Sequence, residues 1–171
     1  LKWLFAGKKV EIPHYNFKKG RRELRGESIK LKKNAILILE GIHGLNPALT
    51  PLIPDELKFK IYVSALTQLN IDKYNRIPTT DTRILRRIVR DNLFRNYNAV
   101  ETIKRWASVR RGEEKYIFPY QENADIMFNS ALLYEFPILK RLAEQNLRTV
   151  TRNHPEFGEA MRLLKFLSYF I

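Results

Sequence analysis

A run of four aliphatic residues, Ile36 to Leu39, leads directly into an acid, Glu40, and a glycine. An uninterrupted apolar run of this length is typical of a strand covered on both faces in a parallel sheet, and we expect a strand from Ala35 to Leu39. In parallel α/β sheets ligands gather outside the carboxyl ends of the strands, so the Glu40 carboxylate would face a nucleotide-bound magnesium ion. Gly41 would leave space for phosphates. The alternative is an acid that only caps the following turn.

The rest of the chain alternates between strand-like and helix-like segments. Strand patterns cover Lys58–Ser64, Ala124–Asn129 and Leu147–Thr151. Helical patterns cover Thr82–Asn96, Ala99–Val109, Tyr134–Gln145 and a last helix that begins at Pro155. Such alternation predicts an α/β layer architecture with a mostly parallel sheet, and 171 residues suffice for one domain with its own core.

Two regions outside this alternation are expected to be less regular. Lys8–Phe17 is interpreted as an extended piece that Pro13 stops, followed by a basic loop around Gly20 and Gly26. Leu45–Pro54 contains three prolines, which favour an irregular segment or one short helical turn.

Apolar stripes at helical spacing define two of the helices. In the helix from Thr82, which Thr79-Thr80-Asp81 is expected to cap, the stripe consists of Ile84, Leu85, Ile88 and Val89. In the last helix it consists of Phe157, Ala160, Met161, Leu164 and Leu167. Each stripe predicts the face that packs on the core.

The formal charge of +13 indicates an anionic partner, namely nucleic acid, anionic lipid or a phosphorylated small molecule. Eleven Lys/Arg and three Glu lie between Leu1 and Lys33, and ten basic and four acidic residues between Arg83 and Lys115. A solvated basic surface is the alternative for either cluster. No apolar run is long enough for a membrane span, and the lack of cysteine excludes disulfides and thiolate metal sites. We expect a cytoplasmic protein.

Five arginines of the first helix offer guanidinium groups that match phosphate oxygens: Arg83, Arg86, Arg87, Arg90 and Arg95. Asp91 can pair with Arg87 and Arg95 at four-residue spacing, so part of this charge would be structural. A phosphate-cradling loop, G-x-x-x-x-G-K-[ST], does not occur in the sequence. Three scattered histidines do not indicate a zinc site.

Taken in order, these segments resemble the uridine kinase/phosphoribulokinase family of P-loop kinases. "VEIPHYNFKKGRR" (Val10–Arg22) is similar to the family's substrate segment, and "ILILEGIHGL" (Ile36–Leu45) to the strand that ends in Glu-Gly. "KFKIYVS" (Lys58–Ser64) resembles the next strand, and "TRILRRIVRDNLFRN" (Thr82–Asn96) the lid helix with its Arg-Arg-x-x-Arg-Asp pattern. "YIFPYQENADIMFNS" (Tyr116–Ser130) resembles the late strand with its Ala-Asp pair.

The resemblance implies a P-loop NTPase-like three-layer α/β/α fold, incomplete here because the P-loop strand is absent, with a lid region over residues 79–118. The remainder of the chain looks closest to a uridine kinase-like subgroup that carries an upstream TGS/threonyl-tRNA synthetase-like region. On this basis residues 1–171 correspond to the C-terminal part of a kinase domain.

The resemblance also implies roles for individual residues, with ATP and Mg²⁺ as cofactors. Glu40 would lie near magnesium, without necessarily touching it, and near the transferring phosphate. Tyr15, Phe17 and Arg22 would bind the acceptor. Arg87 and Arg90, which with Glu40 are the implied catalytic residues, would close over the phosphates as a lid, and the remaining phosphate-binding lid residues would be Arg86 and Arg95.

The sequence departs from the family pattern at four positions. Asn16 stands where the family usually has Asp, and Gly20 replaces a histidine that reads the pyrimidine in uridine kinases. Arg105 falls where those enzymes carry a nucleoside-contacting Gln, and Tyr97 replaces one lid arginine. The acceptor is therefore left open between uridine and other small hydroxylated molecules.

The leading interpretation is an ATP-dependent kinase that transfers a γ-phosphoryl group to a hydroxyl of such an acceptor. The isolated chain, without a phosphate loop, is expected to be inactive and to expose a sheet edge through which it can form homo-oligomers. The alternative is a nucleic-acid-binding or regulatory module derived from a kinase fold, with the basic patch from Lys18 to Arg25 as its surface. A scaffold that has lost catalysis is a third interpretation.

Overall fold

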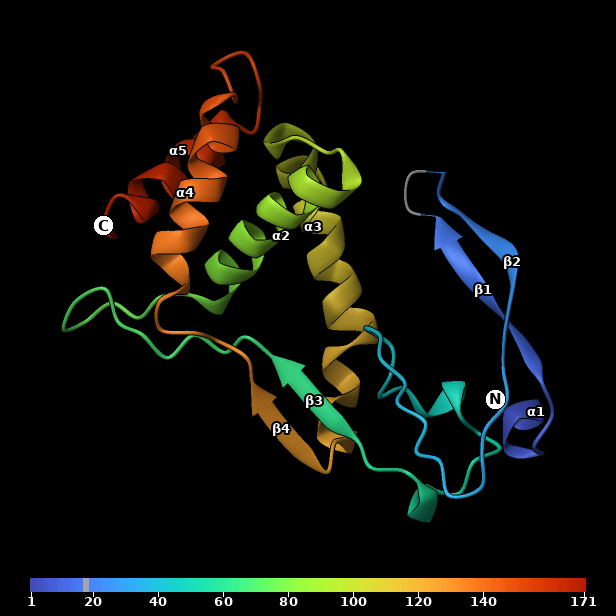
Figure 1. The fold of residues 1–171 in the computed structure, drawn as a ribbon. Coiled ribbons are helices and arrows are strands. Elements are labelled where there is room, and N and C mark those ends of the chain that lie inside the picture. Colours follow the sequence, from blue (N-terminus) through green and yellow to red (C-terminus); the bar gives the residue numbers. More distant parts are fainter. Residues whose placement is uncertain (17–18) are drawn as a thin grey trace. The chain divides into compact units, whose positions relative to one another are not determined.

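The computed structural model describes residues 1–16 and 19–171. Its elements in chain order are α1 (Lys2–Phe5), β1 (Val10–Asn16), β2 (Arg21–Ile29), β3 (Ile61–Ser64), α2 (Thr79–Arg95), α3 (Ala99–Tyr116), β4 (Ile126–Asn129), α4 (Glu135–Arg148) and α5 (Phe157–Leu167), with short 3₁₀ turns at Pro47–Leu49, Asp55–Leu57 and Phe118–Asn123 (Figure 1). They fall into two compact units. The first unit contains residues 1–61 and 114–126, and the second contains residues 62–113 and 127–171.

In the first unit, β1 and β2 form a two-stranded antiparallel ribbon (Figure 1). The interpretation that Pro13 stops the extended piece is wrong, since Pro13 lies inside β1 opposite Leu24. The loop expected around Gly20 and Gly26 is present as a turn at Gly20 only, because Gly26 lies within β2. The ribbon tolerates proline because Pro13 adjoins a register irregularity in a strand that has only one neighbour. Gly20 and Gly26 both adopt positive φ, Gly20 before β2 and Gly26 within it.

The expected strand from Ala35 to Leu39 is also wrong. The segment has no regular structure, and the side chains of Ile36 and Ile38 are 90% and 86% exposed. A strand needs a hydrogen-bonding neighbour and, when apolar on both sides, a layer over each face. Within the part of the chain that the structure describes, neither lies beside this segment. The 3₁₀ turn at Pro47–Leu49 agrees with the irregular segment expected there.

The strands β3 and β4 confirm two sequence predictions and run parallel. The Asp125 N–H donates to Lys60 O at 2.9 Å and the Ser130 N–H to Ser64 O at 2.8 Å, so both strands advance in the same direction. Helices α2 and α3 connect them, which makes the unit α/β as predicted. The larger three-layer sheet stays a prediction.

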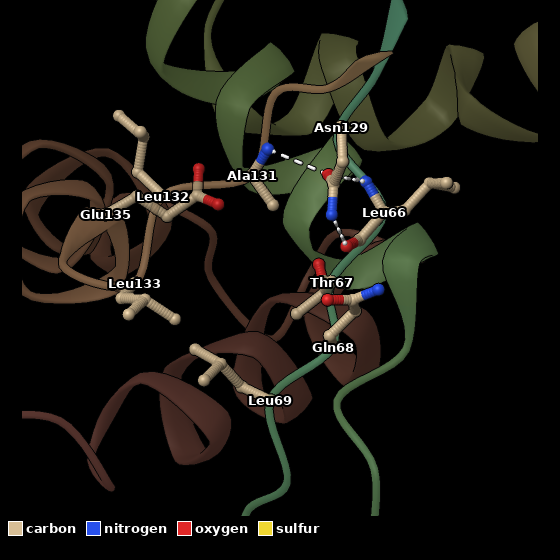
Figure 2. Close-up of a pocket in the computed structure, with 9 residues that line it drawn as sticks. All are labelled: Leu66, Thr67, Gln68, Leu69, Asn129, Ala131, Leu132, Leu133 and Glu135. Atoms are coloured by element: carbon tan, nitrogen blue, oxygen red, sulfur yellow. Dashed lines mark hydrogen bonds between the residues drawn. The ribbon is translucent and has the colours of Figure 1, made fainter. Parts of the chain in front are cut away.

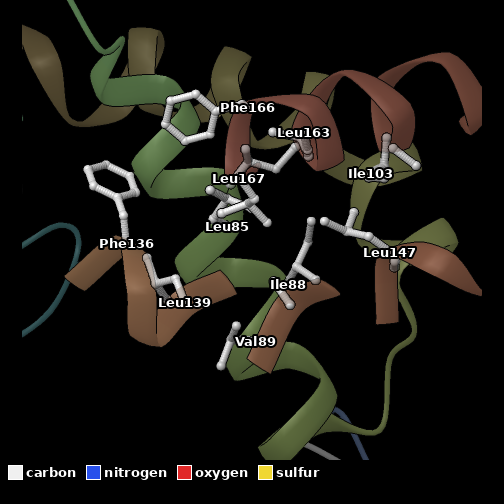
Figure 3. Close-up of a cluster of buried hydrophobic side chains, with 14 of the residues drawn as sticks. Leu85, Ile88, Val89, Ile103, Phe136, Leu139, Leu147, Leu163, Phe166 and Leu167 are labelled. Atoms are coloured by element: carbon white, nitrogen blue, oxygen red, sulfur yellow. The ribbon is translucent and has the colours of Figure 1, made fainter. Parts of the chain in front are cut away.

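The core of the second unit lies among α2, α3, α4 and α5 (Figure 3). The α2 stripe that the sequence predicted is buried throughout. On α5 the buried residues include Leu163 and Phe166, whereas Met161, which the stripe included, is about half exposed. Phe136 stacks against Phe170 with ring centroids 4.7 Å apart, and this contact closes one end of the core.

Three helix boundaries differ from expectation. Helix α2 begins at Thr79 with Pro78 as its N-cap residue and has no side-chain cap, because the proline side chain carries no acceptor. The Asp81 carboxylate accepts hydrogen bonds from Arg162. Helix α3 continues past Val109 to Tyr116. The expected strand over 147–151 is wrong, since α4 extends to Arg148 and a turn then buries Val150. Among the residues that the structure describes, no helix is long and apolar enough to cross a membrane.

Candidate functional site

The β1–β2 ribbon brings together two of the predicted acceptor-binding residues. Tyr15 and Arg22 are direct cross-strand partners, and directly opposite residues project from the same face of a sheet. Both side chains are exposed. Gly20, where the resemblance led us to expect a histidine, lies in the connection between the strands. Phe17 lies outside the described residues.

Glu23, for which the sequence predicted no role, binds the cations at this end of the ribbon. Its Oε1 accepts hydrogen bonds from Lys19 Nζ at 3.1 Å and Asn16 Nδ2 at 3.2 Å, and its Oε2 lies 3.5 Å from Arg25 Nη2. The hydrogen bond from Lys19, followed by that from Asn16, lowers the pKa of Glu23. The four-residue spacing of Lys19 and Glu23 was the available signal, but the pair lies in a hairpin rather than a helix.

Glu40 lies in an exposed turn of the first unit. A turn is formed at Gly41, since the Gly44 N–H donates to Gly41 O at 2.9 Å. His43 packs edge-on against Tyr116, with ring centroids 6.2 Å apart. Within residues 1–16 and 19–171 the Glu40 carboxylate has no hydrogen bond or ion pair, so the turn-capping alternative has no contact to support it.

Helix α2 gathers three of the predicted lid arginines around one buried carboxylate. Asp91 is only 2% exposed. Its Oδ2 lies 3.2 Å from Arg87 Nε, and its Oδ1 lies 3.0 Å from Arg95 Nη1 and 3.7 Å from Arg90 Nε. The pairing of Asp91 with Arg87 and Arg95 is the pairing that the four-residue spacing predicted. We call Asp91 and these three arginines the arginine cluster.

Arg86 has a different environment from the arginine cluster. Its Nε donates to Glu135 Oε2 at 2.6 Å and its Nη2 to Ser130 O at 3.0 Å, so the side chain joins α2 to the start of α4. Arg83 forms an ion pair with the buried Glu113 of α3. Glu113 lies 30 residues from Arg83 along the chain, and Glu135 lies 49 residues from Arg86. No local spacing indicates either pair.

Arg105 stacks over Tyr97, with its guanidinium carbon 4.3 Å from the ring centroid. The resemblance led us to expect a glutamine and a lid arginine at these two positions. The two expected departures contact each other in a cation–π pair. The pair lies just beyond the end of α2 and on α3.

A small cavity lies beyond the carboxyl ends of β3 and β4 (Figure 2). Asn129 bridges the two chain segments there, since its Oδ1 accepts from Leu66 N and its Nδ2 donates to Leu66 O, both at 2.9 Å. Glu135 also lines the cavity, and its Oε1 is buried without a hydrogen-bond partner in the described structure. The volume of about 50 Å³ is far below the several hundred Å³ of ordinary ligand pockets.

The predicted site residues are divided between the two units, each described by itself. Tyr15, Arg22 and Glu40 belong to the first unit, and the arginine cluster belongs to the second. In the described structure no three His, Cys, Asp or Glu side chains are grouped as ligands of a metal ion. Any magnesium at Glu40 would therefore take most of its ligands from phosphates and water, which is how this ion is commonly bound.

Comparison with known proteins shows which protein family this chain resembles in sequence. The sequence model of the Phosphoribulokinase / Uridine kinase family matches residues 1–133. The chain is 31% identical over 128 residues to the uridine kinase of Staphylococcus epidermidis and, over the same length, 31% identical to the uridine kinase of Staphylococcus aureus strain JH9. Each match covers 74% of this chain and 53% of the relative. No solved structure matches.

The chain belongs to the phosphoribulokinase/uridine kinase family. This confirms the resemblance that the ordered motifs indicated. The chain spans about half the length of the curated relatives it matches. The arginine cluster lies inside the matched region, whereas helices α4 and α5 lie beyond it.

Proposed function

We propose that this chain forms the acceptor-binding and lid parts of an ATP-dependent kinase that phosphorylates a hydroxyl group of a nucleoside or a related small molecule. The arginine cluster carries the proposal, because three guanidinium groups around one carboxylate leave an excess of positive charge on one helix. The family membership supports the same reaction.

The proposed reaction forms a bond between the acceptor oxygen and the γ-phosphorus of ATP. The bond from that phosphorus to the bridging oxygen breaks, ADP leaves with the electron pair of that bond, and the proton of the acceptor hydroxyl passes to water. Charge spreads over the phosphoryl oxygens in the transition state, so catalysis depends mainly on positioning and on nearby positive charge. Arg87, Arg90 and Arg95 supply such charge, with N–H forks that match phosphate oxygens.

The residues of this chain supply only part of a site for ATP and Mg²⁺. The exposed carboxylate of Glu40 suits the hydrated coordination shell of magnesium, and Tyr15 with Arg22 offers a ring and a cation to an acceptor. When bound, magnesium would neutralise the charge of the phosphates. The 171 residues contain no G-x-x-x-x-G-K-[ST] loop, so we propose that this chain alone does not turn over ATP.

The test is phosphoryl transfer by the complete gene product. Purified protein is incubated with ATP and Mg²⁺ and a panel of nucleosides and sugar phosphates, and phosphorylated acceptor is measured directly. We expect at least one acceptor to be phosphorylated, and the Arg87→Gln variant to lower its kcat/KM by about 10- to 100-fold. Absence of transfer to every acceptor would exclude the proposed kinase, and turnover by the 171-residue chain alone would contradict its inactivity.

A second candidate function rests on the β1–β2 ribbon. Its strands are exposed along most of their length, and Arg21, Arg22 and Arg25 lie on β2. An exposed basic ribbon can follow a nucleic-acid backbone. RNA or DNA affinity that falls steeply with salt, and that the triple Arg→Gln variant at these positions abolishes, would favour a nucleic-acid-binding module.

A further inference from the structure

Asp91 is the most buried charged side chain of α2. Residues 87, 91 and 95 follow each other at one-turn intervals, so Asp91 lies between Arg87 and Arg95 on one face of the helix. Arg87 contacts one carboxylate oxygen, whereas Arg90 and Arg95 approach the other. The Asp91 carboxylate thus forms ion pairs with all three arginines of the arginine cluster.

We propose that Asp91 is a positioning residue that holds the three guanidinium groups in the arrangement that receives a polyphosphate chain. The inference rests on the proposed function, because it assigns the polyphosphate of the nucleotide to the arginine cluster. Asp91 itself would not touch the phosphates. It would act by fixing the orientation of Arg87, Arg90 and Arg95 before the anion arrives.

Preorganisation is the physical reason for such a residue. Each arginine side chain loses rotamer freedom when it is fixed, and this cost lowers affinity if it falls at the moment of binding. The hydrogen bond from Arg95 and the ion pairs with Arg87 and Arg90 restrain the side chains beforehand, although the buried Arg87 Nε forms no hydrogen bond in the described structure. The hydrogen bond from Arg95 Nη1 to Asp91 Oδ1 sets the direction of the guanidinium plane as well as its distance.

The cluster keeps an excess of positive charge in spite of Asp91. Burial, followed by repulsion from Arg95, lowers the pKa of the Arg90 guanidinium, although Asp91 acts in the opposite direction. The side chain of Arg90 is about half exposed. An anion that approaches this face would therefore relieve repulsion among like charges, and Arg90 is accessible to it.

The backbone of Asp91 adds to the same arrangement. Its carbonyl accepts the N–H group of Tyr97 at 3.1 Å. Asn96 adopts the left-handed conformation, with φ of 58°, and ends α2 directly after Arg95. The residue that orients the arginines thus also fixes the end of the helix that carries them.

Two accounts of Asp91 make opposite predictions for Asp91→Asn. If Asp91 only adds negative charge near the cluster, its removal strengthens the attraction for an anion and tightens binding. If it orients the arginines, the neutral amide loosens them and weakens binding. The sign of the change therefore separates the two accounts.

The experiment titrates the 171-residue chain with inorganic triphosphate by calorimetry at low ionic strength. We expect Asp91→Asn to raise the Kd about tenfold relative to the unmodified chain. Glu113→Gln is the matched control, because it also neutralises a buried carboxylate that pairs with an arginine of α2. We expect Glu113→Gln to leave the Kd unchanged or to lower it slightly.

Two further measurements separate positioning from loss of fold. The Nε–H NMR signals of Arg87 and Arg95 report side-chain order, and we expect Asp91→Asn to broaden or shift them while Glu113→Gln does not. Asp91→Glu keeps the charge but displaces it by one methylene, and we expect it to weaken binding by severalfold. Thermal unfolding followed by circular dichroism identifies a temperature at which each variant is folded. If Asp91→Asn does not fold, the Kd of Asp91→Glu for triphosphate is compared with that of the unmodified chain instead.

The outcomes distinguish this inference from the proposed function. If the unmodified chain does not bind triphosphate, the phosphate-binding role of the arginine cluster fails and the inference is overturned with it. If the unmodified chain binds and both Asp91 variants bind as tightly or more tightly, the inference alone is overturned and the proposed function stands.

Discussion

Arg162 of α5 holds the Asp81 carboxylate in the first turn of α2 by two parallel hydrogen bonds, Nη1 to Oδ2 at 2.8 Å and Nη2 to Oδ1 at 2.9 Å. Glu159 accepts from the same guanidinium at 2.7 and 2.8 Å. The hydrogen bonds to Glu159, followed by those to Asp81, raise the pKa of Arg162. A helix beyond the family match is thereby fixed to the helix that carries the arginine cluster.

Arg162→Gln should lower the free energy of unfolding by about 1–3 kcal/mol. The cost arises because Asp81 is buried and loses its charged partner, while the exposure of Arg162 limits the loss. Urea unfolding followed by circular dichroism measures it. Arg152→Gln, at an exposed arginine, is the control and should change stability by less than about 0.5 kcal/mol. Equal effects of the two variants would contradict the role of the pair.

The helical core gives a second prediction, on packing. Leu163→Ala should lower the free energy of unfolding by about 2–5 kcal/mol, because a fully buried side chain is lost among α2, α4 and α5 and leaves a cavity (Figure 3). Met161→Ala, two residues earlier on the exposed side of α5, should cost less than about 1 kcal/mol. The same urea experiment compares them, and a larger loss for Met161→Ala would show that α5 packs by the face that the sequence stripe indicated.

Much of the structure of the second unit could be predicted from the spacing of residues along its helices. Ile84, Leu85, Ile88 and Val89 are buried as their periodicity predicted, because a helix satisfies its own backbone and needs a partner only for one face. The pairing of Asp91 with arginines one turn away followed for the same reason. These contacts depend on residues that lie within one or two turns of each other.

The features that could not be predicted from the sequence depend on partners that are distant along the chain. The apolar run Ile36–Leu39 has the composition of a buried strand, but a strand forms only where another strand hydrogen-bonds to it. The bidentate contact of Arg162 with Asp81 joins residues 81 positions apart, and no spacing rule indicates it. Tyr15 and Arg22 became neighbours through the register of a hairpin whose proline had been interpreted as a stop.

The exposed apolar segment of the first unit predicts self-association. Ile36 and Ile38 present nearly their whole side chains to solvent, and apolar surface of this kind favours contact with other chains. The double variant Ile36→Ser with Ile38→Ser should shift the chain toward monomer in sedimentation velocity at micromolar concentration. Tyr74→Ser, which removes an exposed side chain from the second unit, should not. Association that is equal in all three proteins would exclude this segment as the contact.

Acid should loosen the turn end of the β1–β2 ribbon. The hydrogen bonds from Lys19 and Asn16 hold the pKa of Glu23 below its ordinary value of 4.5. Because the folded-state pKa lies below the unfolded one, the ribbon gains stability from Glu23 above the unfolded pKa and loses it as the pH falls through the folded one. An NMR titration of the Glu23 carboxyl carbon should give a midpoint below 4.5 in the chain, and Glu27→Gln should leave that midpoint in place. A midpoint at or above this value would mean that the hydrogen bonds are not formed in solution.

The pairing of Tyr15 with Arg22 gives a prediction for activity that rests on the proposed kinase. In the complete gene product, Arg22→Gln should raise the KM for the acceptor about tenfold or more, because a charged hydrogen bond is lost, and should leave the KM for ATP nearly unchanged. Tyr15→Ala should have a similar effect through the lost ring contact. Arg25→Gln, three residues further along β2, is the matched control, because it removes the same charge from the same strand. If all three variants alter the KM for ATP and for the acceptor equally, the ribbon acts through overall charge, and the assignment of an acceptor site to Tyr15 and Arg22 is wrong.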